Sequence, residues 1–430
     1  MGDSSISIIG AGYVGAVTAA CLAELGHNVC CIDVDAEKVD NINAGIPPIH
    51  EEGLEELFQK HAGKMLVAAT DYTSVADSDV SFICVGTPSA QDGEIDLSVI
   101  KTASKSIGIS LRNNEKYHVI AVKSTVVPET TQNVVIPIVE EYSQKRAGTD
   151  FGVAVNPEFL REGRAVHDFM NPDRIVIGEL DKRSGGVVAQ LYEGFDCPLI
   201  RTGLKTAEMI KYASNAFLAT KISFANEIGN ICKELGIDTY EVMHAVGLDH
   251  RISPSFLRAG AGFGGSCFPK DMRALIHKAE ELGYRPKLLR SVMDVNEGQP
   301  KRMIRLLERK LGNLSGRKIA VLGLAFKNDT DDIRESRAIP VIHSLIEKKA
   351  IVSAYDPLAN ENMRPIFPNI RYHSSAKDAL KDVDACLVMT EWDEFKKLGD
   401  EFKVMKNRIV IDGRNIIAFR EHIDYEGLCW

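Results

Sequence analysis

At 430 residues the chain is too long for one hydrophobic core and predicts two or three domains. Apolar residues make up 45% of it and charged residues 26%, as in an ordinary globular protein. A net charge of -9 without a basic tract argues against nucleic acid as a partner, and no apolar run is long enough to span a bilayer. The nine cysteines show neither a C-x-x-C pair nor zinc-like spacing. We therefore expect a reduced, cytoplasmic protein with no metal, no signal peptide and no membrane partner.

The N-terminal stretch has the order of a dinucleotide-binding unit. Ser5–Ile9 predicts a strand, GAGYVG (10–15) a glycine fingerprint, and the pattern through Leu25 a helix. A second strand, Val29–Ile32, closes on Asp33. In this frame Gly10, Gly12 and Gly15 would let a pyrophosphate rest on the helix N-terminus, while Asp33 would accept the ribose hydroxyls. The alternative is a glycine-rich turn that only packs.

Further strands at Val80–Val85, Val119–Val122, Gly152–Val155 and Ile175–Ile177 complete a doubly wound α/β domain to about residue 200. In an open parallel sheet, ligands bind outside the carboxyl ends of the strands. Site residues are therefore expected in the polar stretches that end three of these strands: Gly86-Thr87-Pro88, Lys123-Ser124-Thr125 and Asn156-Pro157-Glu158.

Two pairs of residues four apart stand out among these elements. If Glu158 opens a helix, Glu158 and Glu162 share one face, although the plain alternative is a pair of solvated helix charges. A helix over 206–235 would place Lys211 and Asn215 on one face, and a solvated lysine is again the plain alternative. A helix of this length is expected to bridge domains and to supply a dimer surface. More helices follow at Thr239–Val246, Asp271–Leu282 and Pro286–Leu311.

The stretch GFGGSCFPKD (262–271) has the features of an activated nucleophile. Its glycines permit a tight turn, Ser266 or Cys267 falls where a helix would be capped, and Pro269 suits the first turn. The helix dipole and Lys270 would favour a thiolate at Cys267. The alternative is that Cys267 is an ordinary small core residue.

After Ser315-Gly316 the strand pattern restarts at Lys318–Leu322, Ile351–Tyr355, Ala385–Met389 and Ile409–Ile411, without a glycine fingerprint. The cations Lys327, Arg334 and Arg414 follow strand ends and predict either an anion site or surface charges. The expected fold is therefore α/β, with two Rossmann-like doubly wound domains joined by a long central helix and a helical middle domain. Its boundaries are expected at 1–204, 205–312 and 313–430.

Several long motifs resemble the nucleotide-sugar 6-dehydrogenases over essentially the whole chain. The motifs are GAGYVG (10–15), VGTP (85–88), KSTV (123–126), NPEFLREG (156–163), KYASNAFLATKISFANE (211–227), GFGGSCFPKD (262–271) and FKNDTDDIRES (326–336). The resemblance implies oxidation of a sugar CH₂OH to a carboxylate with two NAD and one water, through a cysteine-bound intermediate. It also implies a part in UDP-glucuronate and polysaccharide biosynthesis.

The resemblance also assigns roles to residues. The implied catalytic residues are Cys267, Lys211, Asn215, Asp271, Glu158 and Thr125. The implied NAD-binding residues are Gly10, Gly12, Tyr13, Val14, Gly15, Asp33, Lys38, Thr87, Thr125, Glu162, Lys270 and Arg334. The implied substrate-binding residues are Glu158, Phe159, Leu160, Arg161, Glu162, Lys211, Asn215, Arg251, Phe256, Phe263, Gly264, Cys267, Phe268, Lys327 and Arg414. Arg251 matches an arginine that reaches the partner's substrate site, which implies a homodimer or a higher homo-oligomer.

The arginine at position 251 is similar to the residue that members of this family acting on UDP-glucose have there. UDP-glucose is therefore the substrate we expect. GDP-mannose, UDP-N-acetylglucosamine and UDP-N-acetylmannosamine stay open as alternatives. Two other classes of protein also stay open. A β-hydroxyacid dehydrogenase relative would perform one oxidation and need no thiol, whereas a silent protein would bind NAD and nucleotide sugar without reaction.

Overall fold

The computed structural model describes residues 4–90 and 92–430, which form two compact units, Met1–Ser214 and Asn215–Trp430. The first unit is built on an eight-stranded sheet of order β3-β2-β1-β4-β5-β6-β7-β8. Its strands are β1 (Ser5–Ile9), β2 (Asn28–Ile32), β3 (Leu66–Ala69), β4 (Val80–Ile83), β5 (His118–Val122), β6 (Phe151–Val155), β7 (Ile175–Glu179) and β8 (Leu199–Gly203). Neighbours run parallel except β6 and β7, which pair antiparallel.

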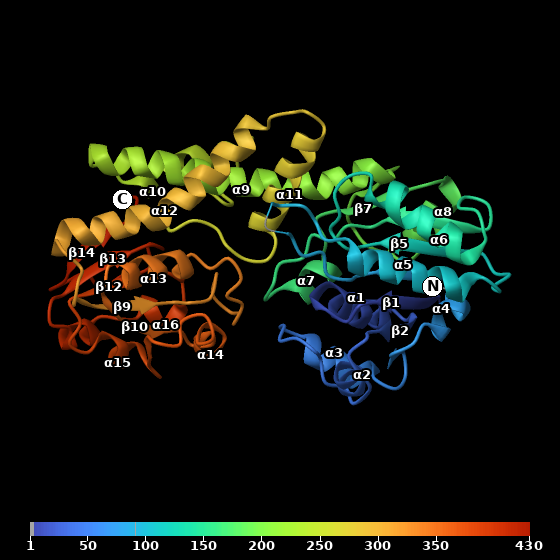
Figure 1. The fold of residues 1–430 in the computed structure, drawn as a ribbon, viewed down its shortest axis with the longest axis horizontal. Coiled ribbons are helices and arrows are strands. Elements are labelled where there is room, and N and C mark those ends of the chain that lie inside the picture. The colour runs from blue at the N-terminus through green and yellow to red at the C-terminus, as the bar shows by residue number, and fades with distance from the viewer. Residues whose placement is uncertain (1–3, 91) are drawn as a thin grey trace. The chain divides into compact units, whose positions relative to one another are not determined.

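Both faces of this sheet are buried, because side chains alternate between two hydrophobic clusters. Ile6 and Ile8 of β1 belong to one cluster, whereas Ile9 belongs to the other. The first face is covered by α1 (Tyr13–Glu24), α3 (Leu54–His61), α7 (Ala165–Met170) and α8 (Lys182–Gln190) (Figure 1). The second face is covered by α4 (Thr73–Asp77), α5 (Ser98–Leu111), α6 (Ile136–Ser143) and the start of α9 (Leu204–Leu235). The remaining helices are α2 (Ala36–Asn43) and the π-turn η1 (Thr131–Val135).

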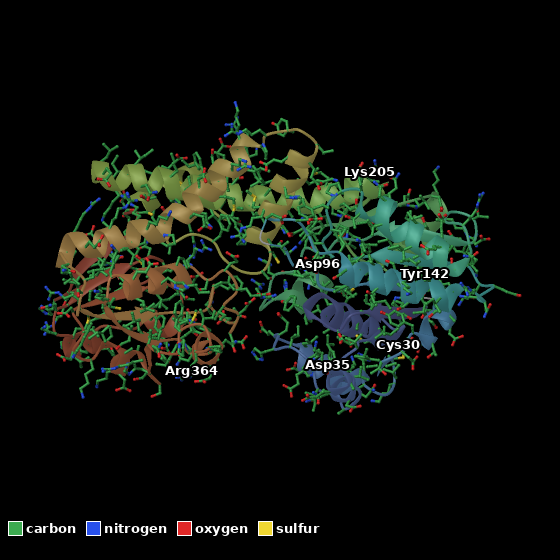
Figure 2. The ribbon with its side chains drawn as sticks, in the orientation of Figure 1. Cys30, Asp35, Asp96, Tyr142, Lys205 and Arg364 are labelled. Atoms are coloured by element: carbon green, nitrogen blue, oxygen red, sulfur yellow. The ribbon has the colours of Figure 1, made fainter. Side chains whose placement is uncertain are left out.

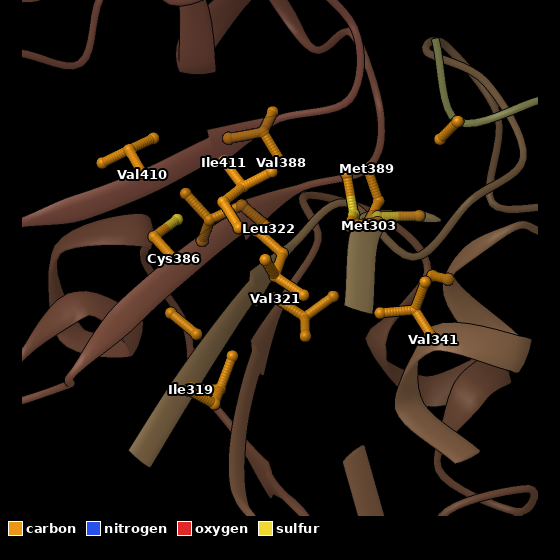
Figure 3. Close-up of a cluster of buried hydrophobic side chains, with 14 of the residues drawn as sticks. Met303, Ile319, Val321, Leu322, Val341, Cys386, Val388, Met389, Val410 and Ile411 are labelled. Carbon is orange, nitrogen blue, oxygen red and sulfur yellow. The ribbon is translucent and has the colours of Figure 1, made fainter. Parts of the chain in front are cut away.

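The second unit repeats the layered plan on a six-stranded parallel sheet of order β11-β10-β9-β12-β13-β14. Its strands are β9 (Lys318–Leu322), β10 (Ile351–Tyr355), β11 (Arg371–Tyr372), β12 (Ala385–Val388), β13 (Ile409–Asp412) and β14 (Asp424–Gly427). Its helices, besides the end of α9, are α10 (Thr239–Gly247), α11 (Phe268–Glu281), α12 (Lys287–Leu311), α13 (Ala338–Glu347), α14 (Asn360–Met363), α15 (Ala376–Leu380), α16 (Asp393–Lys396) and the 3₁₀ turn η2 (Asp400–Val404). Met303 of α12 and Val341 of α13 pack with Val321 of β9 in one core (Figure 3).

The α/β class with two Rossmann-like sheets and a helical centre is thereby confirmed. The expected strands are present, with ends that shift by one or two residues, and the long helix begins at Leu204. Among residues 4–90 and 92–430, no helix combines the length and the hydrophobicity that crossing a bilayer requires.

Candidate active site

The loop before α1 has the geometry of a pyrophosphate cradle. Gly10 has a φ of +100°, and a Cβ on Gly15 would lie 1.8 Å from the Gly10 carbonyl oxygen, so neither position accepts a side chain. A Cβ on Gly12, the N-cap of α1, would meet no described atom beyond its chain neighbours within 4 Å. A phosphate can therefore approach the backbone N–H groups of Tyr13 and Val14 at the helix start.

The Asp33 carboxylate is fixed beside this loop. Its Oδ2 accepts a hydrogen bond from the Ala11 amide at 2.7 Å, and its Oδ1 accepts one from the Asp35 amide at 3.1 Å. Asp35, labelled in Figure 2, caps α2 and accepts from the Lys38 amide at 3.3 Å. An open phosphate cradle with an acid at the end of the second strand fits NAD.

Thr87 and Thr125 lie together at the carboxyl ends of β4 and β5. The Thr87 hydroxyl donates to the Thr125 carbonyl oxygen at 3.0 Å. The neighbouring Ser124 hydroxyl donates to the Val85 carbonyl oxygen at 2.7 Å, which fixes the turn after β5. The two threonines are thus held at the edge of the sheet where ligands bind.

Lys211 and Glu158 form a buried ion pair in the first unit. Lys211 Nζ lies 2.8 Å from Glu158 Oε1, and the two side chains are only 5% and 8% exposed. The Leu160 amide donates to Glu158 Oε2 at 2.6 Å, and the Phe159 ring centroid lies 5.5 Å from Lys211 Nζ. Burial would raise the pKa of the Glu158 carboxyl, but the Lys211 charge and these hydrogen bonds together hold it below its ordinary value. Glu158 is therefore ionised at neutral pH, which is the form a general base requires.

Two expectations about these residues are wrong, one for Glu158 with Glu162 and one for Lys211. Glu158 does not open a helix, because residues 156–164 are irregular and α7 begins at Ala165. Its carboxylate accepts from the amide two residues further on, a local bond that competes with helix formation. Glu158 and Glu162 consequently share no helix face, and Lys211 is not a solvated lysine.

Glu51, which the sequence analysis missed, joins the glycine loop to this irregular segment. It is 5% exposed and accepts from the Tyr13 hydroxyl at 2.5 Å and from the Gly163 and Ala165 amides at 2.8 and 2.7 Å. Burial and Glu51, with a further contribution from Glu162, raise the pKa of the Tyr13 hydroxyl.

A pocket of about 150 Å³ lies beside the same segment, and its lining includes Lys123, Glu158 and Arg161. Lys123 is 4% exposed, and its Nζ donates to Asn156 Oδ1 at 2.9 Å. Burial lowers the pKa of the Lys123 ammonium to about 8. Arg161 forms an ion pair with Asp168 at 2.6 Å. Lys123 belongs to one of the strand-end stretches where site residues were expected, but its burial was not predicted, because a lysine after a strand carries no signal of burial.

Cys267 stands at the N-terminus of α11 in the second unit. It is exposed and occupies the N-cap, with Pro269 in the first turn. The Asp271 amide donates to the Cys267 carbonyl oxygen at 2.8 Å. The thiol therefore lies at the positive end of the helix dipole, which favours a thiolate. The alternative of a buried core cysteine is wrong.

Asp271 is a buried carboxylate one turn below the thiol. It is 2% exposed and accepts from Asn215 Nδ2 at 2.6 Å and from Lys270 Nζ at 2.6 Å. Asn215 and Lys211 lie one turn apart on the continuous helix α9, as predicted. Asp271 thus orients the amide of Asn215 at the start of the second unit.

Three predicted substrate-binding aromatic residues cluster next to the thiol. The Phe268 ring centroid lies 6.1 Å from that of Phe256 and 6.1 Å from that of Phe263. Arg251 is instead exposed, with a side-chain accessibility of 78%, and it pairs with Asp249 at 2.6 Å.

The second Rossmann-like sheet lacks a dinucleotide cradle. A Cβ on Gly323 would lie 2.5 Å from Thr390 Cβ. Asp356, which follows β10 as Asp33 follows β2, is 1% exposed, and its Oδ2 accepts from the Leu324 and Ala325 amides at 2.7 and 3.0 Å and from the Trp392 indole at 3.0 Å. Its Oδ1 accepts from the two amides at 358 and 359, both at 2.9 Å, so this carboxylate is enclosed, whereas Asp33 is partly exposed and open to a ribose.

The three predicted cations of this unit have distinct surroundings. Lys327 Nζ lies 5.7 Å from the Phe326 ring centroid. Arg334 forms an ion pair with Asp332 at 2.6 Å. Arg414 donates from Nε to the Met389 carbonyl oxygen at 2.7 Å and from Nη1 to the Gly262 carbonyl oxygen at 3.2 Å. It therefore binds residues 262–267, the loop before α11 that we call the cysteine loop. Within the described chain, no group of three or more His, Cys, Asp or Glu side chains could hold a metal ion.

Three family models match the chain in sequence. They are described as the NAD binding domain, the central domain and the UDP binding domain of the UDP-glucose/GDP-mannose dehydrogenase family, and they match residues 4–196, 205–298 and 320–419.

Individual relatives match along most of their length. The UDP-glucose 6-dehydrogenase AglM of Haloferax volcanii is 52% identical, over 98% of this chain and 99% of its own. A GDP-mannose 6-dehydrogenase of Pseudomonas putida is 47% identical, over 87% of this chain and 84% of its own. The solved structure of a UDP-glucose dehydrogenase from Pyrobaculum islandicum is 43% identical, with a TM-score of 0.94, over 100% of this chain and 98% of that one.

Proposed function

The chain belongs to the UDP-glucose/GDP-mannose dehydrogenase family of NAD-dependent oxidoreductases, and on this premise we propose that it oxidises UDP-glucose to UDP-glucuronate. The reaction removes four electrons from C6 of the sugar in two steps. The observation that carries the proposal is the exposed thiol of Cys267 at the N-terminus of α11, one turn above a buried carboxylate. A single oxidation of an alcohol has no need of such a thiol.

The first oxidation removes the proton of the sugar hydroxyl, which is released to solvent. We assign Lys211, whose ammonium Glu158 holds at 2.8 Å, to assist this deprotonation and to stabilise negative charge on the oxygen, while Asn215 donates a hydrogen bond to the same oxygen. NAD, when bound at the glycine loop beside Asp33, would supply the hydride acceptor for each of the two oxidations. The Asp271 carboxylate fixes the Asn215 amide for this contact.

The aldehyde must be retained between the two oxidations. The Cys267 thiolate bonds to C6 and the sugar oxygen takes up a proton from water, which gives a thiohemiacetal. The second oxidation returns that proton to water, removes the second hydride and leaves a thioester. Thr125 positions a water and Glu158 takes its proton; the C–S bond breaks as the acid forms, and the sulfur leaves as the thiolate.

UDP-glucose is the substrate that sequence similarity favours. AglM of Haloferax volcanii, a UDP-glucose 6-dehydrogenase by name, is more similar in sequence than the Pseudomonas putida GDP-mannose enzyme, at 52% against 47% identity. Arg251 supports the same choice by its resemblance to the UDP-glucose enzymes. We assign the uridine nucleotide to residues 320–419, which match the model described as a UDP binding domain. We assign Lys327 and Arg414 as the cations that bind this nucleotide, and Arg334 as a residue that contacts NAD.

The test is NADH formation against a panel of UDP-glucose, GDP-mannose, UDP-N-acetylglucosamine and UDP-N-acetylmannosamine, with NADH counted per sugar consumed. We expect two NADH per UDP-glucose and the highest kcat/KM for that sugar. One NADH per sugar would instead indicate a β-hydroxyacid dehydrogenase type of reaction, and none with any of the sugars would indicate a binding protein. A higher kcat/KM for another sugar would replace UDP-glucose as the substrate.

A further inference from the structure

The cysteine loop packs so closely against the segment 326–337 that two of its glycines leave no room for a side chain. A Cβ on Gly264 would lie 2.3 Å from the Glu335 carbonyl oxygen, and a Cβ on Gly265 would lie 2.7 Å from the Phe326 ring. The Gly265 amide donates to the Arg334 carbonyl oxygen at 2.9 Å. The position of the loop therefore depends on the position of this segment.

Glu335 connects the segment to the helix that carries Cys267. Arg273, on α11, donates to both oxygens of the Glu335 carboxylate, at 2.7 and 3.1 Å. Arg337, whose side chain is 4% exposed, donates to Glu335 at 3.2 Å and to Glu297 of α12 at 3.2 Å. The hydrogen bonds from Arg273, acting against burial, hold the pKa of the Glu335 carboxyl below its ordinary value.

The backbone of Glu335 is itself constrained. Its φ is +54°, in the left-handed region that a non-glycine residue adopts only when its surroundings hold it there. The same residue thus supplies both the carbonyl oxygen against Gly264 and the carboxylate that binds Arg273.

From this arrangement we infer that Glu335 is a positioning residue for Cys267, and the inference rests on the proposed function. By holding α11 and the cysteine loop against the segment 326–337, Glu335 fixes the sulfur where it captures the aldehyde before the aldehyde leaves. Its carboxylate takes no part in the chemistry, because both of its oxygens are occupied by arginine. A displaced thiol slows capture, since a displacement of about 1 Å can cost roughly 10²-fold in rate.

Glu335→Gln tests this inference. Glutamine keeps the size of the side chain but loses the charge, and its NH₂ group faces an arginine N–H. We expect the first oxidation to continue while aldehyde escapes. The variant should therefore form more than two NADH per UDP-glucuronate, and an aminooxy reagent should trap at least about tenfold more nucleotide-sugar aldehyde than with the wild type.

Two more variants make the test independent of a folding defect. Arg273→Met breaks the same pair from the helix side, and the double variant should leak no more aldehyde than either single one, since both remove one interaction. Glu335→Asp keeps the charge and should restore part of the retention. In the single variants, amides in peptides covering 262–271 should exchange hydrogen faster, because the Gly265 bond opens more often.

Glu361→Gln is the matched control. Glu361 and Arg364 form a comparable two-bond pair at 3.0 and 2.8 Å on the surface of the second unit, where Figure 2 labels Arg364. This variant should retain aldehyde as the wild type does.

Wild-type stoichiometry alone tests the proposed function, and one NADH per sugar would end that proposal and, with it, the role of Glu335 in aldehyde capture. If the wild type forms two NADH while the folded Glu335→Gln and Arg273→Met variants trap no extra aldehyde, the positioning role is overturned.

Discussion

Glu158 and Asp271 are both buried carboxylates, and their hydrogen bonds suit them to different work. Asp271 accepts from the Asn215 amide and the Lys270 ammonium, so its oxygens are engaged in orienting other side chains. Glu158 is paired with Lys211, and because that charge keeps the pKa of Glu158 below its ordinary value, Glu158 is ionised and able to accept a proton from water in the proposed hydrolysis.

At the scale of single elements, β5 contains a group that links the stability of the first unit to pH. His118 is 1% exposed, and its ring nitrogens lie 2.8 Å from the Ser78 carbonyl oxygen and 2.9 Å from Ser81 Oγ. Burial lowers the pKa of His118 to about 4, from 6.5 in the unfolded chain. Between these values the unfolded state binds a proton that the folded state does not, so stability falls as the pH falls.

We predict that this one site contributes about 3 kcal/mol to the loss of unfolding free energy between pH 7 and 4. His118→Gln should remove that part of the pH dependence, whatever its effect at pH 7. The measurement is urea unfolding across this range, with the exposed His422→Gln as the control. Parallel pH profiles for the wild type and His118→Gln would show that the ring is protonated in the folded protein.

The central strands and the long helix could be predicted from the sequence because their apolar periods are strong. The edge strands β3, β8, β11 and β14 were missed: β8, β11 and β14 mix polar with apolar residues, as edge strands often do, whereas β3 is an apolar run of only four residues. The glycines of the cysteine loop predicted a tight turn, but not the approach of Gly264 and Gly265 to the segment 326–337, and Cys267 was expected at the helix start. By contrast, nothing in the local pattern indicates that Lys211 meets Glu158, because that pairing is made across 53 residues of chain.

The exposed face of α9 is the strongest sign of assembly at the scale of the whole molecule. Phe217, Phe224 and Ile231 recur every seven residues and are 66%, 48% and 52% exposed. Such an apolar stripe is typical of a helix that packs against another chain. We therefore propose a homodimer, in which the exposed Arg251 reaches the partner's substrate. The division into three domains at 204 and 312 and the cytoplasmic location stay predictions.

Subunit exchange tests the dimer and the role of Arg251 together. Arg251→Ala and Cys267→Ala should each be inactive alone. If Arg251 acts on the partner's substrate, a mixed dimer contains one site that lacks both residues and one intact site, so mixing should restore up to about half of the activity per mixed dimer. Mixed dimers shown to form by native mass spectrometry but without activity would place Arg251 outside the partner's site.

The most direct test of the whole account is the intact mass of the Glu158→Gln variant after it is mixed with UDP-glucose and NAD. Both hydride transfers need no proton acceptor at Glu158, whereas thioester hydrolysis does, and loss of a general base typically costs about 10²–10⁴-fold in rate. We predict a burst of two NADH per site, a near stop, and a nucleotide-sugar acyl group on Cys267 that hydroxylamine removes. Glu158→Gln combined with Cys267→Ala should form no adduct. A folded single variant that gives neither burst nor adduct would contradict the account.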